Sequence, residues 1–362
     1  MTGPGPAAAA AAAAAYVQQL PAAALAAAPS HTALAEGLGI ASVVALLLVC
    51  WVIIRTGLLV RIRTRMEAAA RPRWRVDFAC GGVLAGLAAL AMSPLTPGPD
   101  TVFAVFGALS APVLFSLMRL TPRFWALVCG GVAAALVFAS VWLPFAQASG
   151  PAPLPPAPAG AARTGLLRLI GESHVPAGEV YVSANPAIDA DVTGVGPARV
   201  VISHGLWTKA SPQELRASVG HLIGHYEHHD QLSIALLLAV LTLGLFVTCK
   251  ALFAPAARLL GASGVKGVDD PAGTPVLLFV AAVYLSGAIV ADHAFIRAIN
   301  VRADQYSLDH AREPDGLATT LLREWKGEAV DPAPLQEALF YDHPSLQSRL
   351  EHAMRWKAAN GG

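Results

Sequence analysis

The sequence predicts a mainly α fold, in which polytopic membrane helices carry a small α+β insert. Hydrophobic residues make up 55% of the chain against 14% charged, and the mean hydropathy is +0.54. Much of the apolar content is gathered into blocks near the roughly 20 residues that span a bilayer. The lipid bilayer is therefore the expected partner. The net charge of +1 gives no global attraction for nucleic acid, and none is expected to bind.

Residues 1–33 form an alanine- and proline-rich tail. The tail lacks a basic start followed by an apolar core and a cleavage site, so we expect no removable signal peptide. A disordered or loosely helical segment is the structure that this composition predicts.

Six apolar blocks follow, four within residues 34–147 and two within residues 232–297. They are Leu34–Ile54, Val76–Met92, Thr101–Met118, Phe124–Ala146, Leu232–Phe253 and Pro275–Ile296. The second and third blocks are short, and the break at residues 93–100 fits either a tight turn or a re-entrant bend. We therefore expect five or six spans.

A dense run of arginines separates the first two blocks, at positions Arg55, Arg61, Arg63, Arg65, Arg71, Arg73 and Arg75. The positive-inside rule places this segment in the cytoplasm and the N-terminus outside. If every later block crosses once, residues 147–231 also lie outside, and one miscounted span reverses that. Arginine outnumbers lysine and alanine is abundant, as in GC-rich bacterial genomes, so a bacterial inner membrane is the expected location.

Residues 148–163 are rich in proline and alanine and predict a linker into an insert at residues 164–231. Helical spacing marks 164–172, β-branched runs mark 179–183 and 199–203, and glycines at 192–196 favour a hairpin. A second helix has a clear start, because Ser211 can cap it, Pro212 suits its first position and Glu214 can complete a capping box. It should run through His225.

The helix carries two histidines four residues apart, His221 and His225, which can present their imidazoles to one cation. In zincins the residue after the first histidine is a glutamate that takes a proton from metal-bound water. Leu222 stands at that position and can neither accept nor donate a proton. Loss of the base should cost about two to four orders of magnitude in rate.

The sequence resembles the integral-membrane zinc metalloproteases of the CAAX prenyl protease type 1 kind, over residues 175–359. The resemblance rests on an ordered series of motifs: Val175–Val182, Ser211–Ala217, Gly220–Tyr226, Ala303-Asp304, Pro314–Gly316, and Phe340–Ser345 with Arg349. It implies a zincin-like metalloprotease insert, completed by a helical C-terminal part at residues 298–362.

The resemblance also implies roles for single residues. The third zinc ligand of such proteases is a glutamate four residues before an aspartate; the aspartate is Asp304, and Asn300 occupies the ligand position. Asp304 would orient a ligand histidine. His343 resembles a histidine that helps stabilise the oxyanion, and Arg349 an arginine that steadies the substrate or the site. A surface carboxylate and a capped turn are the alternative interpretations of these positions.

Loss of both the base and the carboxylate ligand predicts a pseudoprotease that binds polypeptide without hydrolysing it, with zinc weak or absent. Residues 189–201 resemble the edge strand along which such proteases lay an extended substrate, so an extended peptide or membrane-protein segment is the implied partner. One alternative is an active zinc endopeptidase with altered ligands, such as His221, His225 and Asp304, or slow chemistry with His343. A membrane metal-binding protein is the other.

Overall fold

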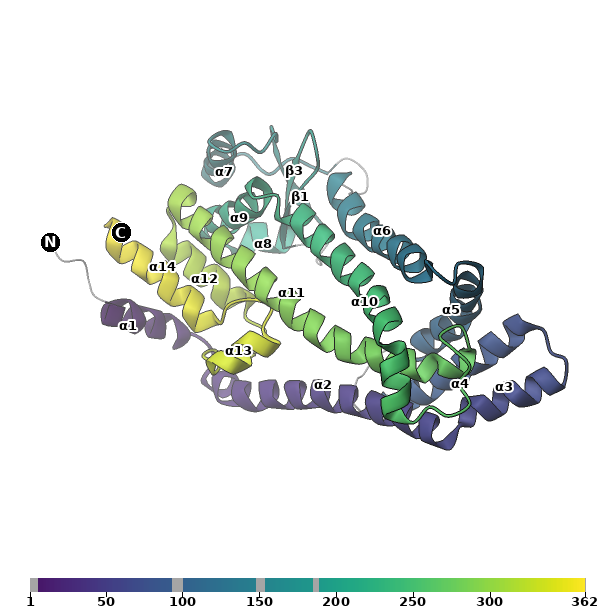
Figure 1. The fold of residues 1–362 in the computed structure, drawn as a ribbon. Coiled ribbons are helices and arrows are strands. Elements are labelled where there is room, and N and C mark those ends of the chain that lie inside the picture. The colour runs from purple at the N-terminus through teal and green to yellow at the C-terminus, as the bar shows by residue number, and fades with distance from the viewer. Residues whose placement is uncertain (1–5, 93–99, 148–153, 185–188, 362) are drawn as a thin grey trace. The chain divides into compact units, whose positions relative to one another are not determined.

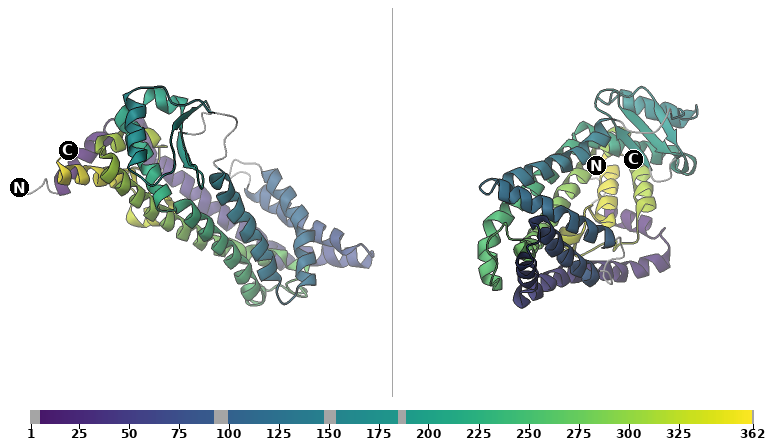
Figure 2. Two further views of the ribbon diagram at one scale, coloured as in Figure 1. Left: turned by 90° about the horizontal axis from the view of Figure 1, so that it is seen from above. Right: turned by 90° about the vertical axis from the view of Figure 1, so that its right-hand side faces the viewer.

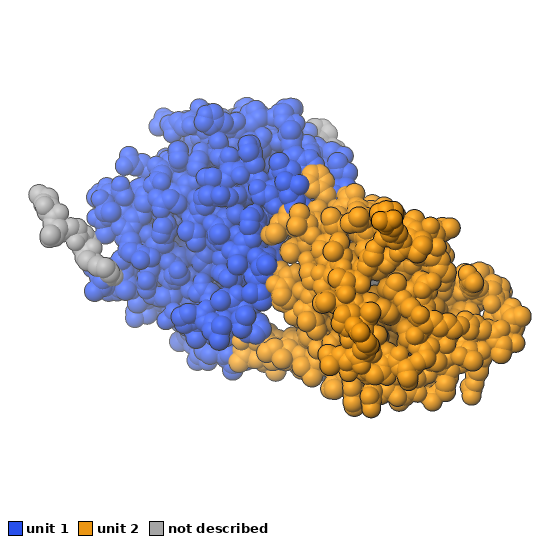
Figure 3. All heavy atoms as spheres, viewed as in Figure 1, with its two compact units in different colours: residues 1–32, 139–236, 290–362 blue, residues 33–138, 237–289 orange. Residues whose placement is uncertain are grey.

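The computed structural model describes residues 6–92, 100–147, 154–184 and 189–361. The chain is mainly helical with one small sheet, which confirms the predicted fold class. It divides into two compact units, residues 1–32, 139–236 and 290–362 in one and residues 33–138 and 237–289 in the other (Figure 3). We call them the insert unit and the membrane unit.

The membrane unit holds the apolar helices of Figure 1, together with the arginine-rich helix α3 and the short helix η1. They are α2 (Ala22–Thr56), α3 (Leu58–Ala68), α4 (Arg73–Met92), α5 (Asp100–Leu120), α6 (Trp125–Ala146), α10 (Asp230–Leu260), η1 (Pro271–Gly273) and α11 (Thr274–Ala311). Helices α2, α6, α10 and α11 also contribute to the insert unit.

Five helices in the described part of the chain are long and apolar enough to cross a membrane: α2, α4, α6, α10 and the helix over Pro271–Ala311. The chain is thus a multi-pass membrane protein, as predicted. The third apolar block lies in α5, whose described part supplies a shorter apolar helix, Gly107–Leu120. Residues 93–99 of the predicted break and residues 148–153 of the predicted linker lie outside the described residues.

Two buried ion pairs lie in the membrane unit, where an isolated charge would be costly. Arg119 donates to Asp77, with one of the two distances 3.1 Å, and Arg63 is paired with Asp270. The four cysteines are buried and unpaired, consistent with small apolar side chains.

The insert unit contains the remaining elements: α1 (Pro6–Val17), α7 (Ala161–Gly171), β1 (Val180–Ser183), β2 (Ala190–Thr193), β3 (Arg199–Ser203), α8 (His204–Lys209), α9 (Pro212–Glu227), α12 (Pro314–Glu324), α13 (Pro334–Phe340) and α14 (Leu346–Asn360). The strand order is β1-β3-β2, with β1 parallel and β2 antiparallel to β3. Helices α7, α8 and α9 pack on this sheet (Figure 2).

The alanine-rich N-terminal segment forms an ordered helix, α1, rather than a loose tail. Ala9 and Ala13 are buried in a cluster with Leu317, Leu350 and Met354. Alanine has the highest helix propensity and a small side chain, so the helix can form and approach α12 and α14 closely. Tertiary packing, which composition does not show, supplies the order.

Candidate functional site

Helix α9 positions the histidine pair, and its start is the predicted one. The Glu214 amide donates to Ser211 Oγ at 3.2 Å and the Ser211 amide to Glu214 Oε2 at 2.7 Å, which forms the capping box. One turn separates His221 from His225, so their rings meet edge to face, 4.6 Å between centroids. Their Nε2 atoms lie 3.0 Å apart.

The other ring nitrogen of each histidine faces a buried aspartate. His221 Nδ1 lies 2.8 Å from Asp304 Oδ1, and His225 Nδ1 lies 2.8 Å from Asp230 Oδ2. Each carboxylate accepts a hydrogen bond from Nδ1–H, so the proton of a neutral ring stays on Nδ1 and Nε2 carries a free lone pair. Two such lone pairs at 3.0 Å repel unless a proton or a cation lies between them. Metal-binding histidines are usually held in this way, with Nδ1 hydrogen-bonded to a carboxylate and Nε2 facing the metal.

Each of the two aspartates also forms an ion pair with an arginine. Arg349 donates two hydrogen bonds to Asp304, each 2.7 Å long, and Arg302 is paired with Asp230. Burial lowers the pKa of His221, while the hydrogen bond to Asp304 acts to raise it. The net lowering favours a neutral imidazole with its Nε2 lone pair available.

Leu222 and Asn300 supply neither a proton acceptor nor a carboxylate. Leu222 is partly buried and packs against the hydrophobic core of the insert, so this position supplies no proton acceptor. Asn300 is 4% exposed, and its Nδ2 donates to the Ile296 carbonyl at 2.9 Å. In the described part of the chain, no group of three His, Cys, Asp or Glu residues could hold a metal ion. The residues present therefore fit the two-histidine half of a zinc site and not a complete one.

The structure brings together His221, His225, Asp304 and Arg349 but does not link His343 to them. His343 is half exposed, and its Nδ1 lies 2.9 Å from Asp342 Oδ1. No hydrogen bond between described residues joins it to the histidine pair.

Two carboxylates near the site were not among the predicted residues. Asp230 is the partner of His225, and its position at the start of the next apolar helix was the available signal. Glu324, at the end of α12, interacts electrostatically with four charged residues: Arg349, Arg323, Asp189 and Asp304. Glu324 is exposed, and partial desolvation by its neighbours raises its pKa. It therefore lies near both the start of β2 and the histidine site.

Strand β2 is an edge strand whose outward groups can be assigned. The Ser203 amide donates to the Asp189 carbonyl at 2.8 Å, and hydrogen-bonded pairs alternate along an antiparallel ladder. The N–H and C=O groups of Ala190 and Val192 thus point away from β3. The amide of Gly194, two residues after Val192, points to the same outward side and donates to the Phe145 carbonyl at 2.8 Å.

No described segment forms a ladder with Ala190 and Val192 on that side. The opposite edge of the sheet is occupied, because Pro156 bridges Tyr181. The edge at β2 also lies beside the histidine helix, since β2 packs on α9 and Tyr226 Oη donates to the Gly194 carbonyl at 3.0 Å. A strand could be added there.

A histidine pair on a capped helix, oriented by an aspartate from a following long helix and flanked by a small sheet, defines a membrane-embedded zincin-like protein. A family model for "Peptidase family M48" matches residues 156–357, more than half of the chain. The chain belongs to peptidase family M48.

Individual relatives agree with this assignment. An uncharacterized metalloprotease, YhfN, of Bacillus subtilis is 29% identical over 197 residues, 52% of this chain and 46% of that protein. A protease HtpX homolog of Syntrophobacter fumaroxidans is 27% identical over 208 residues, 51% of this chain and 72% of that one. The match thus spans less than half the length of YhfN.

A solved structure shares the fold. The crystal structure of S. mikatae Ste24p matches 84% of this chain and 82% of its own, with a TM-score of 0.53 and 18% sequence identity. At that identity the likeness concerns the fold alone.

Proposed function

We propose that this chain is a membrane protein of family M48 that binds an extended polypeptide without hydrolysing it. The observation that carries the proposal is the selective loss at the site. Leu222 and Asn300 replace the proton acceptor and the carboxylate ligand, whereas the supporting contacts of His221 with Asp304 and of His225 with Asp230 remain. A scaffold that keeps its orienting contacts and loses its reactive groups suits binding better than catalysis.

The open edge of β2 supports polypeptide as the ligand. The outward N–H and C=O groups of Ala190 and Val192 supply the main-chain hydrogen bonds that strand addition uses. Main-chain recognition is tolerant of sequence, so we expect the ligand to be an unfolded segment of a membrane or exported protein. Alanine and arginine content supports a bacterial inner membrane as the location.

Cation binding is the second candidate function, favoured by the two facing Nε2 atoms. Two imidazoles are suitable ligands for a divalent transition metal, with water completing the coordination. An active endopeptidase would need a proton acceptor in addition, and Glu324 is the carboxylate to test for that role.

Restoring the missing groups tests catalysis against binding. In the full chain in detergent, Leu222→Glu with Asn300→Glu should gain stoichiometric zinc and chelator-sensitive cleavage of labelled β-casein, while the unaltered chain shows neither. Asn300→Glu alone buries an unpaired carboxylate, so its thermal midpoint should fall without zinc and recover with zinc. Zinc-dependent cleavage by the unaltered chain that Glu324→Gln abolishes would establish the active enzyme instead.

Strand addition has its own test. Ala190→Pro removes an outward N–H at the first residue of the edge strand, where proline is tolerated, and leaves the β2–β3 ladder in place. Binding of fluorescein-labelled unfolded β-casein should weaken, whereas the control Ala190→Val keeps the N–H and the affinity. Equal binding by both variants would show that the β2 edge is not the peptide site.

A further inference from the structure

A cavity of about 850 Å³ lies in the membrane unit, beside the start of α6, the end of α10 and the loop that follows α10. Three cationic side chains line it: Lys250, Arg258 and Lys266. Trp125 and Phe253 are among its apolar lining residues, and no acidic residue is among them. The cavity therefore combines an apolar wall with positive charge.

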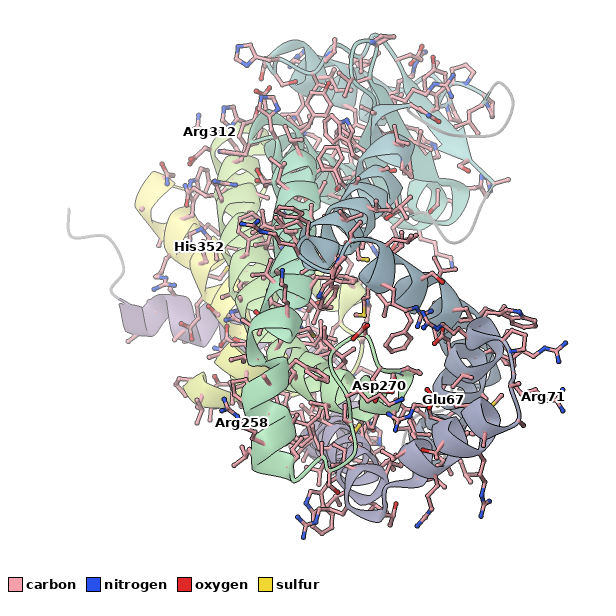
Figure 4. All side chains as sticks on the ribbon, turned by 45° about the vertical axis from the view of Figure 1, so that its right-hand side comes forward. Glu67, Arg71, Arg258, Asp270, Arg312 and His352 are labelled. Carbon is pink, nitrogen blue, oxygen red and sulfur yellow. The ribbon has the colours of Figure 1, made fainter. Side chains whose placement is uncertain are left out.

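The loop that carries Lys266 is fixed to α3. Arg63 donates to the Gly264 carbonyl at 3.2 Å and pairs with Asp270, whose carboxylate also accepts from the Lys266 amide at 2.8 Å. Lys266 Nζ lies 3.1 Å from Glu67, so one of the three cations has a carboxylate neighbour. In Figure 4, Asp270 and Glu67 appear to the right of the end of α10, and Arg258 appears to its left.

The other two cations have no carboxylate partner in the described part of the chain. Lys250 donates to the Arg123 carbonyl, and Arg258 is exposed. The same loop is anchored to the arginine-rich segment between the first two spans, which the positive-inside rule assigns to the cytoplasmic surface. Anionic phospholipids give that surface its negative potential.

A second cavity, of about 450 Å³, shares Trp125 with the first. Its lining is almost entirely apolar and includes Leu84, Phe115, Leu245 and Leu277. Trp125 is 1% exposed, and its buried indole N–H has no acceptor among the described residues. A buried donor without a partner is uncommon and often marks a missing ligand or water.

We propose that the two cavities bind one anionic phospholipid. The cations Lys250, Arg258 and Lys266 would hold its phosphate headgroup, and the apolar cavity beyond Trp125 would hold part of an acyl chain. A free soluble anion would leave the apolar cavity unused, and a zwitterionic lipid would leave the excess positive charge uncompensated. This site is independent of the histidine pair.

The test uses the full chain in detergent and native mass spectrometry with added lipid. The chain should retain one dioleoyl-phosphatidylglycerol in preference to dioleoyl-phosphatidylcholine, and the deacylated headgroup should not compete. The double variant Lys250→Gln with Arg258→Gln removes two charges, each contributing about 1 kcal/mol to lipid binding. It should therefore weaken lipid retention roughly 30-fold. Lys250→Arg with Arg258→Lys keeps both charges and should retain the lipid.

Arg71→Gln is the matched control, because Arg71 is exposed in the same unit and does not line the cavity. In Figure 4 its side chain points outward. Equal losses of binding free energy per removed charge in Arg71→Gln and in the double variant would overturn the site in favour of general surface attraction. Full competition by the deacylated headgroup would overturn the lipid assignment.

Discussion

The hydroxyl of Tyr16 donates a 2.6 Å hydrogen bond to Asp315, a residue 299 positions further along the chain. Asp315 also accepts from Lys357 Nζ at 2.6 Å, so one carboxylate connects α1, α12 and α14. The helix that precedes the first span thus packs directly on the C-terminal part of the insert unit. Helices α1, α12 and α14 lie outside the candidate spans, so their direct contact places them on the same side of the membrane.

This contact predicts the topology from one span alone. A single span, in α2, separates Tyr16 from the arginine-rich segment at 61–75, which should face the cytoplasm. The insert unit and its histidine pair should therefore face the opposite, extracytoplasmic side. Alkaline phosphatase fused after Gly362 should be active in a bacterial host, and a green fluorescent protein fusion there should be dark.

A control fusion in the segment between α3 and α4, at residue 70, should give the reverse pattern. Fluorescence from the C-terminal fusion together with an active phosphatase at residue 70 would contradict the predicted orientation.

Docking of α1 should depend on pH through Asp315. Burial acts to raise the pKa of this carboxyl, but hydrogen bonds from Lys357 and Tyr16 outweigh it and leave the pKa below its ordinary value. A lowered pKa stabilises the docked state above the unfolded pKa of about 3.9, and that stabilisation is lost as pH falls further. Hydrogen-exchange protection factors in residues 6–17, which are corrected for the intrinsic pH dependence of exchange, should fall as the pH drops below about 4.

Asp315→Asn should show fast exchange in residues 6–17 at every pH, because the charge is absent throughout. Tyr16→Phe removes one hydrogen bond at a partly exposed site and should cost about 1 kcal/mol of docking free energy. An unchanged exchange profile in Asp315→Asn would refute the role of this carboxyl.

Local features of the fold could be predicted because they depend on near neighbours in sequence. Ser211, Pro212 and Glu214 define the start of α9, and the structure contains the predicted capping box. Apolar blocks likewise predicted the membrane helices, because span length follows from bilayer thickness.

Contacts that depend on a turn or on distant packing could not be predicted. The pairing of His225 with Asp230 requires His229 to adopt a φ of 53°, a left-handed conformation that is uncommon outside glycine and lets α10 begin beside α9. The strand order β1-β3-β2 and the place of Glu324 near Asp189 also arise from tertiary packing. The resemblance placed Arg349 near the site, but its pairing with Asp304 became visible only in the structure.

The pair between Asp304 and Arg349 should contribute strongly to stability. Both side chains are largely buried, at 2% and 12% exposed, and two hydrogen bonds join them. Asp304→Asn would leave the guanidinium without its counter-charge, which should lower the free energy of unfolding by about 3 kcal/mol. Chemical denaturation in detergent measures this loss, and the exposed Asp331→Asn should change stability by less than about 0.5 kcal/mol. Equal stability of both variants would argue against the predicted contribution.

Gly224, between the two histidines, should be intolerant of a side chain. A β-carbon at this position would lie 2.9 Å from Cβ of Tyr306 and 3.1 Å from Cα of Ala303 on α11. Gly224→Ala gains about 1 kcal/mol of helix propensity but overpacks the contact by about 1–3 kcal/mol, so α9 and α11 should separate slightly. The contact between His221 and Asp304 joins the same two helices and should lengthen with it.

Histidine Nδ1 chemical shifts and the thermal midpoint of Gly224→Ala measure this change. We expect a lower midpoint and an altered His221 signal. The control is Gly171→Ala at the end of α7, where a β-carbon meets no atom within 4 Å. There the helix propensity acts alone, so the midpoint should stay the same or rise. If Gly224→Ala behaved like Gly171→Ala, the close approach of α9 and α11 would not be what holds the histidine pair against Asp304.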